Sequence, residues 1–318
     1  MDPDNELEYE FPGVVRYYKS GDIERYDGTV TAPATIDPTT GVTSKDLVID
    51  KSTGLSVRLY LPDGIYSDNK LPILFFIHGG AFMIHTAASP VYHNLINCLV
   101  SNAKAVGVSV TYRLAPEHPV PVAYADTWDA LKWVVSSCKG GGDPWLSKYG
   151  DPDNIIMAGD SAGANIAHNI AVKFDRDVPE DFPKIKGLLL MNPYFWGKEP
   201  IECETLEPDF RTWLDNTWHF ICARKFGLDH PFLNPMAAAE KEWMMPRCDR
   251  VMVTVAENDM FRERGRKYVE VLQSNGWKGA VEMYETYGER HVYFLAKPKC
   301  EKAIREIEAM ATFIRRKW

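Results

Sequence analysis

Residues 154–174 read NIIMAGDSAGANIAHNIAVKF. The apolar run over 154–158 predicts a buried strand, and the pattern from Ala162 to Phe174 predicts a helix. Gly159 and Gly163 flank a tight turn between them, with Ser161 at its centre. A serine on a sharp strand-to-helix turn projects its hydroxyl from the sheet edge, beside backbone N–H groups of the helix start. The stretch therefore predicts an α/β architecture in which Ser161 is a nucleophile.

Strand-like and helix-like segments alternate on both sides of this stretch. The segments expected as strands are Leu55–Leu61, Pro72–Ile77, Ala105–Tyr112, Ile185–Met191, Arg250–Ala256 and Ala280–Glu285. The segments expected as helices are Val91–Ala103, Ala123–Ser137, Arg262–Asn275 and Glu301–Arg316. This alternation predicts a mostly parallel sheet with helices on both faces, and ligands bind such sheets at the carboxyl ends of the strands.

Two segments do not follow the alternation. We expect residues 1–50 and about 196–245 to form a cap over the site, within a single domain that spans residues 1–318. The second segment is rich in aromatic residues, which suits the apolar roof of a pocket, although ordinary packing against the core is the alternative. The predicted pocket residues are Phe82, Phe195, Trp196, Trp213, Trp218 and Tyr293.

A second glycine-rich turn follows the apolar run that ends at Ile77. It reads His78-Gly79-Gly80-Ala81-Phe82. Glycines at a strand end let backbone N–H groups approach a ligand closely, and such donors stabilise the oxyanion that forms during acyl transfer. The predicted donors are the N–H groups of Gly79, Gly80, Ala81 and Ala162, while His78 is expected to brace the loop.

A general base and an acid complete the predicted chemistry. In the chain order serine, acid, histidine, the base follows the last strand. That position belongs to His291, whereas His168, His219 and His230 lie in the helix after Ser161 or in the expected cap. The acid follows the preceding strand, where Asp259 is preferred and Glu257 is the competitor.

Composition limits the classes of partner. The formal net charge is -8, which disfavours nucleic acid and anionic membranes because both are bound by clustered basic residues. The six cysteines are scattered without a paired motif, so neither a disulfide framework nor a metal site is expected. The acidic first ten residues lack the pattern of a signal peptide, and we expect a cytoplasmic protein without a cofactor.

Several motifs taken together resemble one known family. They are HGGAF from His78, YRLAPEHPVPVAYAD from Tyr112, GDSAGAN from Gly159, and the Asp259 and His291 pair. Together they are similar to the plant carboxylesterases, which belong to the hormone-sensitive-lipase-like branch of the α/β hydrolases. The similarity begins with MDPDNELEYEFPGVVRYYKSGDIERYDGT and covers nearly the whole chain.

The resemblance implies an α/β-hydrolase fold and a cytosolic, metal-free esterase whose triad is Ser161, Asp259 and His291. Many members have a third glycine where this chain has Ala81, and that substitution keeps the N–H. The expected reaction is hydrolysis of small to medium, moderately apolar esters. Relatives in this family imply two alternatives: the same machinery used for transesterification, elimination or cyclisation, and a non-catalytic gibberellin-receptor-like binding protein. For the oligomeric state, a monomer and a homodimer are both compatible with the sequence.

Overall fold

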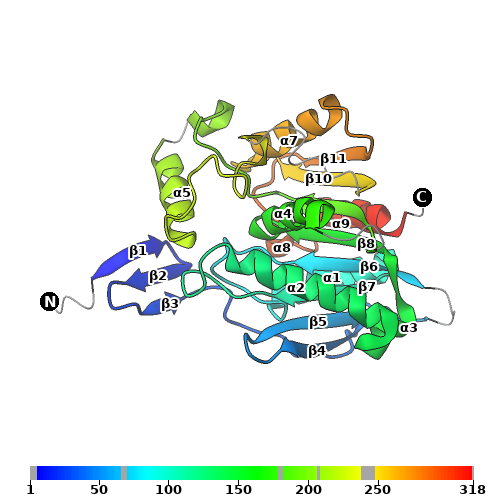
Figure 1. The fold of residues 1–318 in the computed structure, drawn as a ribbon. Helices are drawn as coiled ribbons and strands as arrows, with labels where there is room; N and C mark the ends of the chain where they lie inside the picture. Colours follow the sequence, from blue (N-terminus) through cyan, green and yellow to red (C-terminus); the bar gives the residue numbers. More distant parts are fainter. Residues whose placement is uncertain (1–5, 66–69, 178–181, 206–207, 238–247, 317–318) are drawn as a thin grey trace.

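The centre of the fold is a sheet whose strands follow the sequence predictions closely. The computed structural model describes residues 6–65, 70–177, 182–205, 208–237 and 248–316. The sheet consists of β4 (Thr43–Asp50), β5 (Leu55–Leu61), β6 (Leu71–Ile77), β7 (Val106–Thr111), β8 (Gly150–Asp160), β9 (Ile185–Met191), β10 (Arg250–Ala256) and β11 (Ala280–Thr286). Their spatial order is β11-β10-β9-β8-β6-β7-β5-β4 (Figure 1). β5 pairs antiparallel with β4 and β7, and the remaining neighbours pair parallel.

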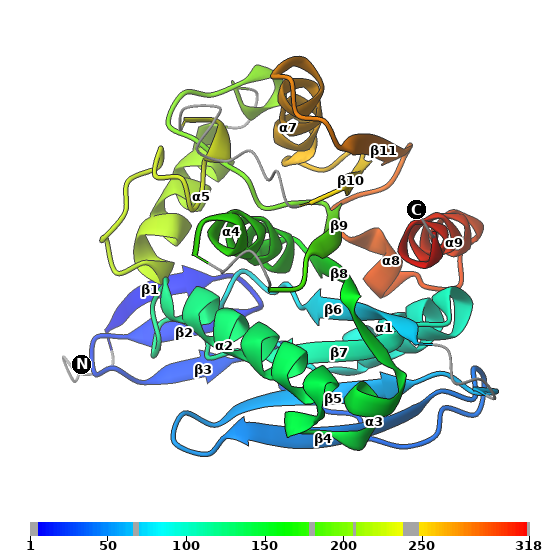
Figure 2. The ribbon, with the colours of Figure 1, turned by 45° about the vertical axis from the view of Figure 1, so that its right-hand side comes forward.

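Helices cover both faces of this sheet. The helices of the described residues are α1 (Pro90–Ala103), α2 (Val122–Ser136), α3 (Pro144–Tyr149), α4 (Ala162–Asp177), α5 (Pro208–Ile221), α7 (Arg262–Ser274), α8 (Tyr293–Ala296) and α9 (Glu301–Arg315), with short helical turns η2 (Ser137–Gly141), η3 (Glu202–Thr205) and η4 (Pro235–Ala237). Of these, α5 lies beyond the end of the sheet (Figure 1). Buried side chains of α1, α8 and α9 belong to one core cluster, and those of α2, α4 and α7 belong to the other. Figure 2 shows these two groups of helices on opposite sides of the sheet.

The two clusters arise because successive strand residues point to opposite faces. In β6, Ile73 and Phe75 belong to the cluster under α2 and α4, while Leu74 and Phe76 belong to the cluster under α1 and α9. All four side chains are fully buried. A strand with both faces buried reads as a continuous apolar run, and this explains why the sequence identified the central strands so clearly.

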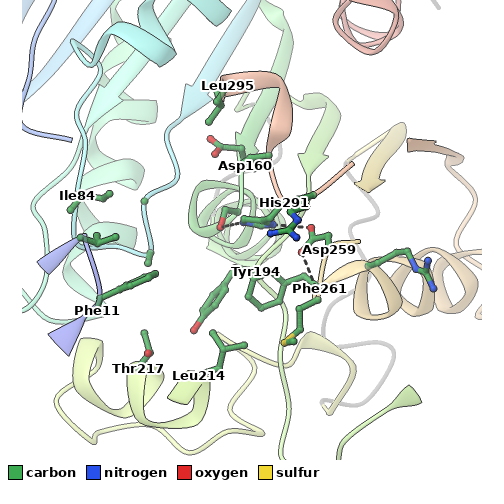
Figure 3. Close-up of a pocket in the computed structure, with 18 of the residues that line it drawn as sticks. Phe11, Ile84, Asp160, Tyr194, Leu214, Thr217, Asp259, Phe261, His291 and Leu295 are labelled. Atoms are coloured by element: carbon green, nitrogen blue, oxygen red, sulfur yellow. Dashed lines mark hydrogen bonds and ion pairs between the residues drawn. The ribbon is translucent and has the colours of Figure 1, made fainter. Parts of the chain in front are cut away.

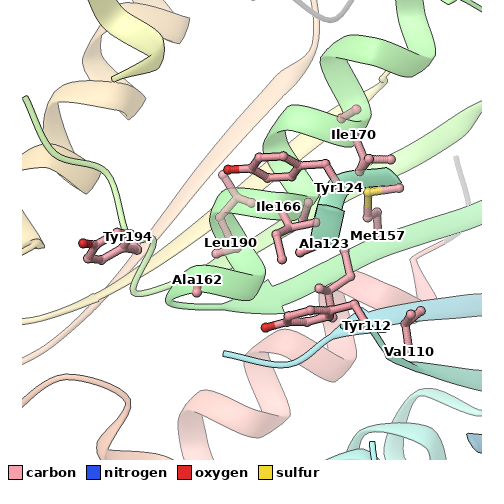
Figure 4. Close-up of a cluster of buried hydrophobic side chains, with 14 of the residues drawn as sticks. Val110, Tyr112, Ala123, Tyr124, Met157, Ala162, Ile166, Ile170, Leu190 and Tyr194 are labelled. Atoms are coloured by element: carbon pink, nitrogen blue, oxygen red, sulfur yellow. The ribbon is translucent and has the colours of Figure 1, made fainter. Parts of the chain in front are cut away.

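One of these clusters supports the turn that carries Ser161. Ile166 and Ile170 of α4 lie against Tyr124 of α2 and Met157 of β8 (Figure 4). All of these residues are buried, and Ala162 at the start of α4 is fully buried with them. The start of α4 is therefore fixed on the sheet, which also fixes the backbone on either side of Ser161.

A smaller sheet lies beside α5 at the end of the large sheet that carries Ser161 (Figures 1 and 2). It contains β1 (Leu7–Phe11), β2 (Val15–Tyr18) and β3 (Ile23–Arg25), paired antiparallel in that order. Tyr9 stacks on Phe220 of α5 at 4.0 Å between ring centroids, and Phe11 meets Trp213 of α5 edge-on at 4.5 Å. We call β1, β2, β3 and α5 the cap.

The predicted α/β architecture with helices on both faces of a mostly parallel sheet is confirmed. One boundary needs correction, because Thr43–Asp50 were expected in the cap and instead form β4 at the edge of the large sheet. The strand lies at the edge of the sheet and exposes Asp46 and Val48 to solvent, so it lacks the continuous apolar run of the central strands. Residues 1–5, 206–207 and 238–247 of the two expected cap segments lie outside the described residues.

Candidate active site

Ser161 occupies a strained turn between β8 and α4. Its φ is 50°, a left-handed value that is uncommon for residues other than glycine. Its N–H donates to the Met191 carbonyl at 2.9 Å, and its carbonyl accepts from Tyr194 N–H at 3.1 Å. A Cβ on Gly163 would lie 2.0 Å from the Ile77 carbonyl oxygen. The tight turn therefore depends on a glycine at 163 and on hydrogen bonds to the segment after β9.

The structure brings Ser161, His291 and Asp259 into one hydrogen-bonded chain (Figure 3). His291 Nε2 lies 2.9 Å from Ser161 Oγ, and His291 Nδ1 lies 2.8 Å from Asp259 Oδ2. Asp259 is 4% exposed, and it also accepts hydrogen bonds from Asn192 Nδ2 at 2.8 Å and Phe261 N–H at 3.0 Å. Such an arrangement can transfer a proton from the serine hydroxyl to the imidazole.

The electrostatic surroundings favour the protonated form of His291. Burial lowers its pKa, but the charge of Asp259, the hydrogen bond to Asp259 and the charge of Asp160 together outweigh burial. The pKa of His291 is therefore raised above the ordinary value of 6.5. This stabilises the imidazolium that forms when the serine hydroxyl loses its proton.

The competing residues from the sequence make other contacts and take no part in this hydrogen-bonded chain. The Glu257 carboxylate accepts a hydrogen bond from Gly288 N–H at 2.7 Å. His168 is buried beside Tyr268, with Nδ1 at 3.1 Å from the tyrosine hydroxyl, and burial lowers its pKa to about 3. His219 lies on α5, and His230 lies in the segment after it, where its Nδ1 accepts from a backbone N–H. None of these four residues lies within the Ser161, His291 and Asp259 chain.

The structure distinguishes among the predicted oxyanion donors. The N–H of Gly79 donates to Asp160 Oδ1 and to the Tyr92 hydroxyl, each at 2.9 Å, so it is not available to a ligand and this prediction is corrected. Gly80 and Ala81 line the cavity at Ser161, and Ala162 begins α4. In the described part of the chain, no acceptor pairs with the N–H of these three residues.

Asp160 is a site residue that sequence reasoning missed. Its carboxylate is 1% exposed and accepts from Gly79 N–H at 2.9 Å and from the Tyr92 hydroxyl at 3.0 Å. Burial raises the pKa of Asp160 to about 6, against the opposing effects of these two hydrogen bonds and of His291. Its position next to Ser161 in GDSAG was the available signal. The residue connects the serine turn to the glycine loop.

His78 also supports the glycine loop and takes no part in the hydrogen-bonded chain. Its Nδ1 lies 2.8 Å from the Gly79 carbonyl oxygen, and its ring stacks on Tyr112 at 4.3 Å. Complete burial lowers the pKa of His78 to about 3, so the ring is neutral. The Tyr112 hydroxyl donates to the His78 carbonyl at 2.8 Å, which holds the end of β6 in place.

A cavity of about 940 Å³ lies between Ser161 and the cap (Figure 3). Of the predicted pocket residues, Trp213 lines it, and the other five are at least 96% buried and lie outside its lining: Phe82, Phe195, Trp196, Trp218 and Tyr293. The correction has a physical cause, since large aromatic side chains serve equally well as core packing. The lining also contains Tyr194 and Phe210, from the aromatic-rich stretch around the second cap segment, and three aromatics that the sequence did not indicate, Phe11, Tyr92 and Phe261.

Comparison with known proteins gives a consistent set of similarities. A family model described as an alpha/beta hydrolase fold matches residues 74–295. The chain is 41% identical over 297 residues to probable carboxylesterase 2 of Arabidopsis thaliana, with 93% of each chain covered. It is 38% identical to 2-hydroxyisoflavanone dehydratase of Glycyrrhiza echinata, with 97% of this chain and 96% of the relative covered.

A third relative and a solved structure extend the comparison. The chain is 38% identical to tuliposide A-converting enzyme 1, chloroplastic, of Tulipa gesneriana, covering 98% of this chain and 79% of the relative. The fold also matches the crystal structure of esterase LipW from Mycobacterium marinum, with a TM-score of 0.72 and 22% identity over 87% of this chain and 82% of the other. This structural match establishes similarity of fold.

Proposed function

This chain belongs to the plant carboxylesterase family of α/β-hydrolase-fold proteins, and from that premise we propose that it hydrolyses carboxylic esters through an acyl-enzyme. The observation that carries the proposal is the hydrogen-bonded chain from Ser161 Oγ through His291 to Asp259, with distances of 2.9 and 2.8 Å. Ser161, at one end of these hydrogen bonds, lines a cavity large enough for a small-molecule ester.

In the first half of the reaction, Ser161 Oγ attacks the acyl carbon while His291 Nε2 takes its proton. The imidazolium then returns that proton to the leaving alkoxide, and an ester bond to Ser161 remains. Asp259 orients the imidazole and stabilises its positive charge. In the second half, His291 activates a water molecule in the same way, and the carboxylic acid leaves with Ser161 restored.

Backbone N–H donors stabilise the negative charge that develops on the carbonyl oxygen of the substrate. The N–H groups of Gly80, Ala81 and Ala162 stabilise this oxyanion: Gly80 and Ala81 line the same cavity as Ser161, Ala162 follows Ser161 at the start of α4, and none of the three N–H groups has a partner in the described chain. Asp160 and Tyr92 act as positioning residues, because their contacts to Gly79 hold the loop that presents Gly80 and Ala81.

The cavity favours small to medium, moderately apolar esters. Its side toward the cap carries Phe11, Val14, Trp213 and Leu214, so apolar substrate groups are removed from water there. Its volume of about 940 Å³ is that of a site for a small organic molecule rather than for a polymer chain. The cap thus sets the size and polarity of the substrate.

A second candidate function uses the same residues for elimination, transesterification or cyclisation. The similarity to 2-hydroxyisoflavanone dehydratase favours it, and the apolar cap residues Phe11, Trp213 and Leu214 in the cavity lining would disfavour water beside an acyl-enzyme. Product analysis separates the two functions. Free acid and alcohol as the only products, in assays that include plant metabolites, exclude the second function.

We also propose which cofactors and partners the reaction needs and where in the cell it takes place. The nucleophile, base and oxyanion donors all come from the chain, so the reaction is proposed to need no metal or cofactor. In the described residues, no helix is both long and apolar enough to cross a bilayer. We place the protein in the cytoplasm as a monomer or homodimer, acting on small-molecule esters without a nucleic-acid or membrane partner.

Release of p-nitrophenol from p-nitrophenyl acetate and butyrate tests the proposal. Wild-type protein is expected to hydrolyse both esters, and Ser161→Ala is expected to lower kcat by at least about 10⁴-fold, because the nucleophile is lost. A folded wild-type protein that releases no nitrophenol, or a Ser161→Ala variant with near wild-type activity, contradicts it.

A further inference from the structure

Tyr194 is attached to the serine turn although it lies outside the proposed catalytic chain. It follows β9 by three residues. Its N–H donates to the Ser161 carbonyl at 3.1 Å, and its carbonyl accepts from Asn165 Nδ2 at 3.0 Å. The backbone of Tyr194 therefore has a fixed position relative to the nucleophile.

The ring of Tyr194 packs against two other aromatic rings. It meets Phe261 nearly edge-on at 4.8 Å between ring centroids and Phe82 at 6.3 Å. The residue is 3% exposed, yet it belongs to the lining of the cavity. Figure 3 shows its hydroxyl directed away from the triad and toward Leu214 and Thr217 on α5. The hydroxyl thus has a defined place on the cap side of the cavity.

This hydroxyl has no hydrogen-bond partner among the described residues. Burial raises the pKa of Tyr194, so the group remains protonated at neutral pH and can donate a hydrogen bond. The hydroxyl oxygen is not sealed from solvent. Because Tyr194 lines the cavity, the hydroxyl opens onto it. A bound molecule can therefore reach it.

The other polar groups on the cap side of the cavity already have hydrogen-bond partners or are shielded from solvent. The Thr217 hydroxyl donates to the Trp213 carbonyl at 2.8 Å and lies 2.7 Å from the Tyr9 hydroxyl. The indole N–H of Trp213 is sealed from solvent. The remaining lining there is apolar and comes from Phe11, Val14, Phe210 and Leu214. In this part of the described lining, Tyr194 offers a donor within apolar surroundings.

We propose that the Tyr194 hydroxyl is a specificity-determining subsite that binds a neutral oxygen acceptor on the substrate. This inference rests on the proposed esterase function and narrows its substrate class. The preferred substrates are apolar esters that carry a ketone, ether or hydroxyl oxygen beyond the ester group. A few fixed polar groups in an apolar pocket orient a ligand, and a donor already held in place needs no reordering on binding.

The charges around the cavity favour a neutral acceptor over a carboxylate. The cationic lining residues Arg262 and Arg290 come from the segments after β10 and β11, on the triad side. Arg262 is paired with Glu263. The residues that α5 contributes to the lining carry no charge, and the nearby α5 residue Asp215 is acidic. Among the lining residues that the structure describes, no cation lies on the cap side, so an anion at the Tyr194 hydroxyl would lack a compensating charge there.

Matched esters test the proposal. In one series of p-nitrophenyl alkanoates, a single methylene from carbon 4 to carbon 7 is replaced by an ether oxygen, and each ester is compared with its all-carbon counterpart. A second series places the oxygen in the alcohol part of acetate esters, which covers the opposite binding direction. The measured quantity is the ratio of kcat/KM for the oxygen-containing ester to that for its counterpart.

For at least one position of the oxygen, this ratio is expected to be about threefold to tenfold higher in wild type than in Tyr194→Phe, the value of one hydrogen bond. The matched control is Tyr287→Phe, which removes a hydroxyl from a tyrosine that is 66% exposed and outside the cavity lining. That control should give the wild-type ratio. Equal ratios in wild type and Tyr194→Phe at every position would overturn the subsite.

Binding without turnover separates this inference from the esterase proposal. Calorimetry on Ser161→Ala and on Ser161→Ala/Tyr194→Phe gives the dissociation constants of the same intact esters. The subsite predicts the same threefold to tenfold difference in their ratios. If the difference appears while wild type hydrolyses no ester, the esterase proposal fails and the subsite stands. If hydrolysis occurs without the difference, the subsite fails alone.

Discussion

The carboxylate of Asp160 accepts a hydrogen bond from the backbone N–H of Gly79 at 2.9 Å. The residue next to the proposed nucleophile thus holds the first glycine of the loop that carries the proposed oxyanion donors. The same carboxylate accepts from the Tyr92 hydroxyl at 3.0 Å. Ser161 and the loop are therefore positioned by one buried group, and this relationship makes the geometry of the site testable away from the triad.

Asp160→Asn should lower kcat for p-nitrophenyl butyrate by about 10- to 100-fold. The amide keeps the shape of the side chain but presents N–H to one of two donors, so the loop shifts and the oxyanion loses alignment. Steady-state kinetics measures the effect. Asp153→Asn, an exposed position near the start of β8, is the matched control and should retain wild-type kcat. An unchanged kcat in Asp160→Asn would remove its positioning role.

The pH profile reports the state of His291. A general base must be neutral to accept a proton, and the pKa of His291 is raised above 6.5. The value of kcat/KM should therefore increase with rising pH through a midpoint above 6.5. In Asp259→Asn, the midpoint should move to lower pH because the carboxylate charge that raises the pKa is gone. A wild-type midpoint below 6 would be inconsistent with this assignment.

Gly163→Ala should disrupt the turn at Ser161. The added Cβ would lie 2.0 Å from the Ile77 carbonyl oxygen, so β6 or α4 must move, at a cost of about 3 kcal/mol or more in the free energy of unfolding. Gly227→Ala is the matched control, since its Cβ would meet no atom within 4 Å. Urea unfolding measures both variants. Equal stability of the two would show that the turn tolerates a side chain.

Glu204→Gln should destabilise the attachment of α5. Glu204 is fully buried between Arg211 of α5 and Arg264 of α7, with N–O distances of 2.9 and 2.6 Å. Removing this charge leaves two guanidinium groups without their carboxylate and should lower the free energy of unfolding by about 3 kcal/mol. The control is Glu301→Gln, whose exposed pair with Arg305 should contribute less than about 1 kcal/mol. Similar losses in the two variants would contradict this account.

Most of the fold could be predicted from local patterns in the sequence. Strands buried on both faces, such as Ile185–Met191, are continuous apolar runs and were identified with their observed bounds. The edge strand Thr43–Asp50 was missed because its first four residues are polar and resemble a loop. Strand ends also located Ser161, Asp259 and His291, since parallel strands bring their carboxyl ends to one edge.

The cavity lining could not be predicted in the same way. Trp196 and Trp218 look like pocket residues by composition, but each is buried and uses its indole N–H inside the protein, toward Asp215 and Phe226 respectively. Phe11 lines the cavity only because the small N-terminal sheet packs on α5. Contacts between segments 200 residues apart leave no periodic signal in either segment.

Covalent labelling of the nucleophile tests the central claim most directly. A fluorophosphonate reacts with a serine hydroxyl only when a neighbouring base activates it. We predict that wild-type protein gains one adduct, that peptide mapping places it on Ser161, and that His291→Ala lowers the labelling rate by at least about 10³-fold. Labelling at another serine, or a folded wild-type protein that is not labelled at all, would contradict the assignment of Ser161 as the activated nucleophile.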